Sequence, residues 1–254
     1  MNIYSYIDER QRVGRALGER HGEGGSAMTV ERTIAFVDLA GFTALTEVHG
    51  DAAAIDLLDT FSAVARLAVG CGAELVKTIG DAVMLAAPDP ATGIAAVRRV
   101  FEECYDKDSF LEPRGGLHHG PVIARDGDYF GATVNLAARV ASRAGTGQAL
   151  ATTAVAQAAR DAGLDTVELG PQQLRNILEP VDIWAVELCP THVDMSVDPV
   201  CRMRLSCQAA VARVRHAGSE HWLCSLDCLR TFAAAPDRYI QTDRYIQTEG
   251  ISSA

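Results

Sequence analysis

Two stretches of the sequence each place an aspartate at the end of an apolar segment, and together they limit the folds open to this chain. The first, residues 32–38, is an apolar run that ends at Asp38 and is followed by Gly41 and Thr43. Thr43 is a suitable helix cap. The pattern therefore predicts a buried strand that delivers one acid to its carboxyl end before the chain turns into a helix.

In the second stretch, the apolar segments 75–78 and 82–86 are joined through Ile79 and Gly80, and Asp81 follows at once. A glycine suits a tight turn that needs a positive φ, so we expect a hairpin with Asp81 at its tip. A lone aspartate after glycine often only caps a turn. Two strands of one sheet can, however, place Asp38 and Asp81 side by side, and paired carboxylates are hard oxygen ligands for Mg²⁺ or Mn²⁺.

Length, composition and charge exclude several classes of protein. A chain of 254 residues is long enough for one sizeable core plus a small module. It has no run of about 18 apolar residues, so we expect no membrane span. The first residues lack an apolar signal core, so we expect a cytoplasmic protein. The net charge of −10 argues against nucleic-acid binding, and against a polymerase, whose palm also uses paired carboxylates.

Hydrophobic periodicity predicts strands that interleave with helices. We expect a hairpin over 73–86 and strands over 116–124, 149–152, 166–169 and 181–186, with helices over 43–69, 91–105, 130–142 and 153–162. The apolar positions of the first helix are Leu45, Val48, Ile55, Leu58, Phe61, Val64 and Leu67. Such interleaving requires an α/β or α+β sandwich, but spacing alone does not give the strand order. Residues 1–30 are polar and glycine-rich, and we expect a flexible segment there.

The stretches 36–43 and 77–81 resemble the two metal-site motifs of the class III nucleotidyl cyclases, the adenylate and guanylate cyclases. The resemblance continues to about residue 186 and implies a catalytic domain over 31–187. It implies an α+β fold, a ferredoxin-like core with a mostly antiparallel sheet and helices on one face. It also implies two Mg²⁺ or Mn²⁺ ions on Asp38 and Asp81 with the Leu39 carbonyl, and it assigns Phe36 to the substrate site.

Further residues match the nucleotide-binding positions of that family. The resemblance implies that Arg114 binds phosphate, and that Asn135 and Arg139, four residues apart on one helical face, orient the ribose and hold charge on the α-phosphoryl group. Lys77 and Asp128 fall at the base-selecting positions, where a Lys donor and a carboxylate acceptor suit adenine, so ATP is the expected substrate. The resemblance also implies that Arg175 stands in for a lysine that, in that family, reaches the triphosphate. His118 and His119 are expected to be structural.

The resemblance implies two-metal phosphoryl transfer, in which ATP becomes 3′,5′-cyclic AMP and pyrophosphate leaves. A single short hairpin can hardly serve both the base and the metals, and in this family the site lies between two subunits. We therefore expect a homodimer, because a two-fold interface gives two equivalent sites. One chain would supply Asp38, Asp81 and Arg114, and the other would supply Lys77, Asp128, Asn135 and Arg139.

The end of the chain carries a second motif. After a linker over 188–196, residues 197–240 resemble the YHS-type metal-binding domains, and residues 241–254 form a tail. Seven cysteines, an odd number without a secretory signal, suit reduced thiols or metal ligands. Cys201, Cys224 and Cys228 would form a thiolate cluster for zinc or copper(I), and a tetrahedral zinc needs a fourth ligand. Cys207, His216 and His221 are all candidates; the alternative is three buried thiols in a small core.

Two functional hypotheses from different classes follow. The first is an adenylate cyclase with a metal-responsive appendage. The second is a non-catalytic nucleotide-binding or metal-sensing signalling protein that retains the fold, which the presence of Asp38, Asp81, Asn135 and Arg139 disfavours. A metal carrier dominated by the C-terminal module would leave the first 186 residues unexplained.

Overall fold

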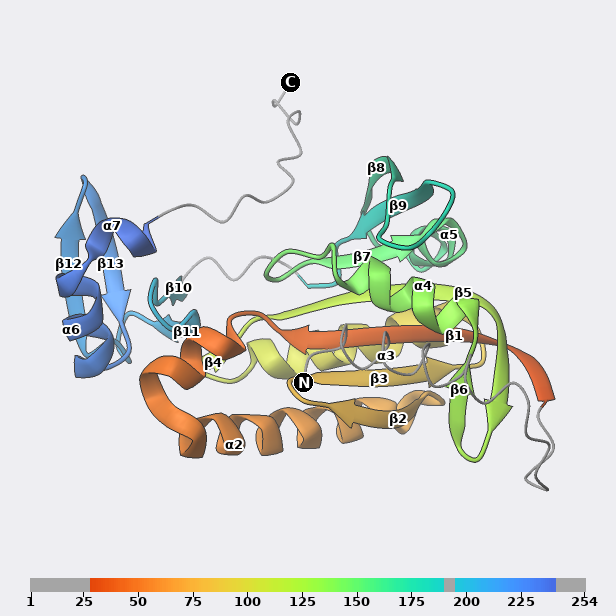
Figure 1. Cartoon of the computed structure of the whole chain (residues 1–254), viewed down its shortest axis with the longest axis horizontal. Helices are drawn as coiled ribbons and strands as arrows, with labels where there is room; N and C mark the ends of the chain where they lie inside the picture. The colour runs from red at the N-terminus through yellow and green to blue at the C-terminus, as the bar shows by residue number, and fades with distance from the viewer. Residues whose placement is uncertain (1–27, 190–194, 241–254) are drawn as a thin grey trace.

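The computed structural model describes residues 28–189 and 195–240 (Figure 1). The predicted N-terminal segment, most of the linker and the tail lie outside these residues. The main sheet runs in the order β2-β3-β1-β5-β7-β9-β8, with β6 paired to β5. Its strands are β1 (Met28–Leu39), β2 (Glu74–Ile79), β3 (Ala82–Ala87), β5 (Pro113–Arg125), β6 (Asp128–Phe130), β7 (Ala149–Thr152), β8 (Thr166–Gln172) and β9 (Val181–Val186).

The sheet is mostly antiparallel, as predicted, and among its described pairings only β5 and β7 run parallel. The first half follows the chain order β1, α2 (Phe42–Ala68), β2, β3, α3 (Pro90–Tyr105), β5. With the strand order β2-β3-β1-β5, this is the β-α-β-β-α-β arrangement of ferredoxin-like folds. The fold is therefore mixed α+β. No helix of the described residues is both long and apolar enough to cross a membrane.

Helices cover both faces of the sheet, so the prediction that they lie on one face is wrong. Alternate residues of β1 point to opposite faces. Ala35 and Val37 pack in the core that contains the buried residues of α2, α3 and α5 (Thr153–Asp161). Ile34 and Phe36 pack in a second core with α4 (Ala132–Ala141). The reason is visible in the composition of β1, whose central residues are apolar on both sides, as in strands buried between two layers.

Helix α2 is broken at Gly50, whose φ of 79° and ψ of 173° lie in a region that essentially only glycine adopts. The predicted stripe of apolar residues along this helix is partly wrong, since Ile55 and Leu67 are exposed. The break changes the helical phase, so that beyond Gly50 the buried positions include Leu57 and Phe61. The segment before the break, residues 42–49, is positioned separately from the rest of the helix.

The C-terminal module, residues 195–240, docks against the end of the molecule where α2 begins (Figure 1). It contains β10 (Met195–Val197), β11 (Met203–Ser206), β12 (Ala212–His216), β13 (Ser219–Leu223), α6 (Leu226–Ala234) and α7 (Pro236–Tyr239). Strand β11 pairs with β10 and with β4 (Phe110–Leu111), which belongs to the preceding domain. A shared sheet thus joins the module to the rest of the chain.

One buried arginine fastens this contact. Arg204 of β11 is 3% exposed, and its guanidinium donates to the carbonyl oxygens of Cys104, Tyr105 and Lys107 at the end of α3. The same guanidinium lies 4.8 Å from the centre of the Tyr105 ring. The last carbonyls of a helix have no intrahelical partner and carry partial negative charge, so a cation there is stabilised.

Candidate functional site

Asp38 and Asp81 come together at the end of the central strands, as the sequence predicts. Asp38 lies near the end of β1, opposite Ala82 of β3. Asp81 lies in the β2–β3 turn beside Gly80, whose φ of 60° agrees with the predicted positive value. The Leu39 amide donates to the Asp81 carbonyl oxygen at 3.2 Å, which holds the two acidic segments against each other. Two carboxylates and the nearby Leu39 backbone therefore form one group of hard oxygen donors.

Arg114 of β5 makes a bidentate ion pair with Asp38. The Arg114 Nε lies 2.6 Å from one Asp38 oxygen, and a terminal nitrogen lies 3.1 Å from the other. Burial raises the pKa of Asp38 above its usual value, while Arg114 opposes that shift and the charge of Asp81 adds to it. Burial also raises the pKa of Asp81. The two acids are thus costly to hold ionised here, and a cation between them would relieve that cost.

Lys77 and Asp128 form a second charged pair. The Lys77 Nζ lies 2.5 and 2.6 Å from the two Asp128 oxygens, and both side chains are about four-fifths buried. They come from β2 and β6, 51 residues apart, so the structure brings together the two residues assigned to the base. The Tyr129 amide also donates to Asp128, and the Tyr129 hydroxyl binds Glu74 of β2. These contacts fasten β6 across the edge of β2.

The acidic group and the Lys77 pair lie on the same face of the sheet. Residues directly opposite on antiparallel strands share a face. Lys77 lies opposite Met84, which packs in the core with Phe36. Asp38, two residues from Phe36, therefore points to that face, and so does its partner Arg114. This is the face that carries α4, opposite the layer of α2, α3 and α5.

Helix α4 approaches the sheet closely and carries both of its assigned residues. A Cβ at Gly116 would lie 2.1 Å from the Ala141 amide nitrogen, so only glycine permits this contact between β5 and α4. Asn135 is half-buried, whereas Arg139 is 2% exposed. The roles assigned to these two residues stay predictions.

Two other assigned residues have contrasting environments. Phe36 is 1% exposed within the core beneath α4. Arg175 is exposed in the segment between β8 and β9, next to Asn176, whose φ is 62°. Among the described residues, neither side chain forms a hydrogen bond or ion pair with the Asp38 group, and both assignments stay predictions.

The two histidines of β5 have separate polar partners on opposite faces. The His118 Nδ1 lies 2.8 Å from the Thr152 hydroxyl, and the His119 Nδ1 lies 2.9 Å from the Thr33 hydroxyl. Burial lowers the pKa of His118 to about 4, so His118 is neutral at pH 7. These contacts fit the structural role predicted for both.

A second group of potential ligands lies in the C-terminal module. The Cys201 and Cys224 sulfurs are 3.4 Å apart, and the Cys224 and Cys228 sulfurs are 3.6 Å apart. His49 of α2 completes the group: its Nε2 lies 3.5 Å from both the Cys224 and the Cys228 sulfur. The four ligand atoms all lie within 4.8 Å of one another. Cys201 and Cys228 are fully buried.

The sequence pattern predicts the three thiols but not His49. Of the three residues predicted as candidates for a fourth ligand, Cys207 is exposed, His216 binds Asp237, and His221 packs against Phe232. None of the three belongs to the group that the described residues form. His49 is 152 residues before Cys201, and no local pattern marks it as a ligand. Only the docking of the module on α2 brings it to the thiols.

Asp198 holds the backbone around these thiols. Its side chain is fully buried and accepts hydrogen bonds from the amides of Val200, Cys201 and Cys224 at 2.8, 3.3 and 2.8 Å. The Cys228 amide donates to the Ser225 hydroxyl, which caps α6. The Cys201 and Cys224 thiols can donate to the Cys228 sulfur, and this lowers the pKa of Cys228.

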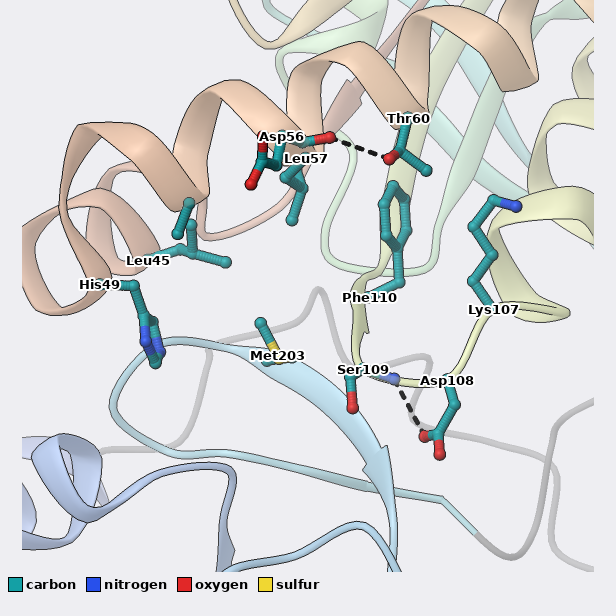
Figure 2. A pocket seen from close by; sticks show the side chains of 11 residues that line it. Leu45, His49, Asp56, Leu57, Thr60, Lys107, Asp108, Ser109, Phe110 and Met203 are labelled. Carbon is teal, nitrogen blue, oxygen red and sulfur yellow. Dashed lines mark hydrogen bonds between the residues drawn. The ribbon is translucent and has the colours of Figure 1, made fainter.

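A pocket of about 560 Å³ lies between α2, β4 and β11. Figure 2 shows Leu45, His49 and Leu57 reaching from α2 toward Phe110 and Met203. None of the residues assigned to nucleotide binding lines it. This pocket belongs to the contact between the C-terminal module and α2, away from the Asp38 group.

Comparisons with known proteins point to one family. The sequence model described as the adenylate and guanylate cyclase catalytic domain matches residues 27–186, more than half of the chain. The chain is 37% identical over 158 residues to a protein of Mycobacterium tuberculosis named as a pH-sensitive adenylate cyclase, covering 61% of this chain and 40% of that protein. It is 35% identical over 151 residues to an adenylate cyclase of Streptomyces coelicolor, covering 58% and 40%.

Solved structures give the same fold. An adenylate cyclase from Trypanosoma brucei, described in its monomeric state, matches with a TM-score of 0.59 and 25% identity, covering 63% of this chain and 89% of that one. The adenylyl cyclase CyaB from P. aeruginosa matches with a TM-score of 0.56 and 23% identity, covering 67% and 99%. The chain spans about two fifths of the length of the two curated relatives named above.

Proposed function

The chain belongs to the adenylate and guanylate cyclase catalytic-domain family, and from this premise we propose that it is an adenylate cyclase. It converts ATP to 3′,5′-cyclic AMP and pyrophosphate at a site shared between the two subunits of a homodimer. The observation that carries the proposal is the convergence of Asp38 and Asp81, on the same face of the sheet as the Lys77–Asp128 pair. A protein that kept this fold without catalysis would gain nothing from two buried acids whose ionisation is unfavourable.

Asp38, Asp81 and the Leu39 carbonyl would hold two Mg²⁺ or Mn²⁺ ions, and their donor chemistry fits such ions. When bound, the ions lower the pKa of the ribose 3′-hydroxyl and neutralise phosphate charge. The chain's residues do the rest by positioning. Arg114, which forms an ion pair with Asp38 in this structure, would bind a phosphate of the substrate. Most of the rate enhancement comes from alignment and charge stabilisation.

Lys77 and Asp128 would select the base. An adenine offers an acceptor at N1 and a donor at its 6-amino group, which match an ammonium and a carboxylate. Their ion pair holds the two side chains next to each other, where one base would contact both. Each such polar pair discriminates bases by about 1–3 kcal/mol, which is sufficient to favour ATP over GTP.

Asn135 and Arg139 would complete the site from α4. Their four-residue spacing places them on one side of the helix, where Asn135 orients the ribose and Arg139 stabilises charge on the α-phosphoryl oxygens. Lys77, Asp128, Asn135 and Arg139 would act on the nucleotide held by the partner's Asp38 and Asp81. Arg175 would contact the triphosphate, and Phe36 would belong to the substrate site.

We also propose that Cys201, Cys224 and Cys228 bind a thiophilic metal, zinc or copper(I), in a module of the YHS type. The Cys224 sulfur lies 3.4 Å from the Cys201 sulfur and 3.6 Å from the Cys228 sulfur, and this convergence supports the role. The alternative, a small core of buried thiols, would not require Asp198 to orient the chain around two of them.

The decisive experiment measures cyclic nucleotide formation from ATP and from GTP with Mn²⁺, in the wild type and in Lys77→Glu. The wild type should make cyclic AMP. Lys77→Glu places a second carboxylate beside Asp128, so ATP turnover should fall about 10–100-fold, by the free energy of one or two polar pairs, while weak GTP turnover changes far less.

Lys107→Glu is the matched control, because it makes the same charge change at the only other lysine of the chain. It should leave both rates near those of the wild type. A wild type with no cyclase activity would contradict the enzymatic proposal and favour a non-catalytic nucleotide-binding protein. Unchanged ATP kinetics in Lys77→Glu would show instead that the purine lies elsewhere.

A further inference from the structure

We propose that His49 is the fourth ligand of the thiolate metal site, so that one bound metal ion joins helix α2 of the catalytic domain to the C-terminal module. The inference rests on the proposed metal binding by Cys201, Cys224 and Cys228 and goes beyond it. Three ligands then come from the module and the fourth comes from the domain that carries Asp38. The site is incomplete in either part alone.

The geometry fits a tetrahedral zinc ion. With Zn–S distances of about 2.3 Å and Zn–N of about 2.0–2.1 Å, a regular tetrahedron separates its ligand atoms by roughly 3.5–3.8 Å. Four of the six separations between the ligand atoms are 3.4, 3.5, 3.5 and 3.6 Å, and the other two are at most 4.8 Å. Three thiolates and one imidazole are also a ligand set typical of structural zinc sites, all of whose positions are closed by protein. The mixed set favours zinc over copper(I).

His49 belongs to the short first segment of α2, so a metal bound to His49 would hold that segment. It is the last residue before the break at Gly50, so it closes the segment 42–49. In Figure 2 its imidazole points from α2 toward the chain of the module. A metal on His49 therefore fixes the end of this segment without requiring any shift of the longer part of α2.

The other end of the same segment begins beside the catalytic acids. β1 ends at Leu39, and Gly41 with a φ of 90° precedes the helix. The module also touches this point: a Cβ at Gly41 would lie 2.4 Å from the Arg202 Cβ. Arg202 is next to Cys201, a proposed metal ligand. Metal binding would therefore hold both ends of residues 41–49, the segment that follows Asp38 in the chain.

The module has an anchor that does not depend on the metal. Arg204 binds the end of α3, and Ser206 binds Asp108 through its amide and hydroxyl. With β11 fixed there, the metal site becomes the second point of attachment, at the other side of the pocket that His49 and Met203 line. Removing the metal should release residues 42–49 while the module stays docked at α3.

The test uses the full-length protein, reduced and depleted of metal, then loaded with Co²⁺ or Zn²⁺. Cobalt absorption reports the number and type of ligands, and competition with a chromogenic chelator gives the zinc affinity. His49→Ala should shift the cobalt bands and weaken zinc binding about 10-fold or more, since even orienting partners of a metal ligand are worth about 10–100-fold. His216→Ala is the matched control, because His216 lies outside the ligand group, and it should match the wild type.

Hydrogen exchange gives an independent reading. Zinc should slow exchange of the amides in residues 42–49 in the wild type and in His216→Ala, but not in His49→Ala, because the tie to α2 is absent. If His49→Ala keeps the wild-type cobalt spectrum, zinc affinity and exchange, the inference about His49 is overturned while metal binding by the thiols stands. If the wild type binds neither metal, the proposed thiolate site fails, and this inference fails with it.

Discussion

At the scale of single residues, the candidate site concentrates groups that are unfavourable for folding. Asp38 and Asp81 both have raised pKa values because burial disfavours their ionised forms. Within the described part of the chain, only Asp38 has a charged partner at hydrogen-bonding distance. Active sites of many proteins hold such costly groups for function. The predicted consequence is a measurable trade of stability against activity at Asp81.

Asp81→Asn should lose most of its activity. Its stability relative to the wild type should increase as pH rises. A raised pKa means that the folded state binds more protons than the unfolded state between pH 3.8 and the raised value. Stability of the wild type falls as pH rises through that window, and the neutral amide escapes this loss. Thermal unfolding without divalent ions, from pH 4 to pH 7, tests the sign. Loss of a metal ligand should lower kcat about 100-fold or more.

Asp89→Asn is the control with the opposite sign. Asp89 caps α3, and hydrogen bonds from Thr92 lower its pKa, so its contribution is present at neutral pH and lost as pH falls. An asparagine is also a good cap, so the helix should persist. The stability of the wild type relative to Asp89→Asn should increase as pH rises. A parallel pH dependence in the two variants would contradict the account of Asp81.

At the scale of elements, the sequence allowed prediction of structure wherever a local pattern decides it. The β2–β3 hairpin, the strand over 149–152 and the strand over 181–186 agree with the structure because alternation and turn residues lie within a few positions. The second layer around α4 was not predicted, since it depends on which face of β1 each helix covers. His49 was also missed, because its contact to Cys224 spans 175 residues and leaves no periodic signal.

The break in α2 gives a prediction at this scale. Gly50→Ala should either strain the backbone by about 1–3 kcal/mol, the usual cost of such a conformation without glycine, or straighten the helix and swing His49 away. Both outcomes should lower zinc affinity, and denaturant unfolding should show lower stability in the metal-loaded protein. Gly70→Ala is the control, because Gly70 has no positive φ and a Cβ there meets nothing within 4 Å. Equal stability and equal zinc affinity in the two variants would count against the break as the element that presents His49.

At the scale of the whole molecule, the two faces of the sheet have different tasks. The layer of α2, α3 and α5 closes the main core and supports the C-terminal module at one end (Figure 1). The other face carries α4, the Asp38 group and the Lys77–Asp128 pair. A second copy of the chain set against that face by a two-fold axis would pair each acidic group with the partner's base-binding group.

Mixing of two inactive variants tests this shared site. Asp38→Ala removes a metal ligand and Arg139→Ala removes a group acting on the partner's nucleotide, so each should be nearly inactive alone. In a mixed dimer one site carries both changes and the other carries neither. With equal mixing and free exchange, about half the dimers are mixed and each has one intact site, so about a quarter of wild-type activity should return.

A second variant guards against misfolding. Because Arg139 is 2% exposed, its loss can also weaken the fold. Asn135→Ala, at a half-buried position of the same helix, therefore provides a second partner for Asp38→Ala. Subunit exchange is verified with two affinity tags. Failure of both mixtures to recover activity, with exchange demonstrated and both variants folded, would exclude a site built from two chains.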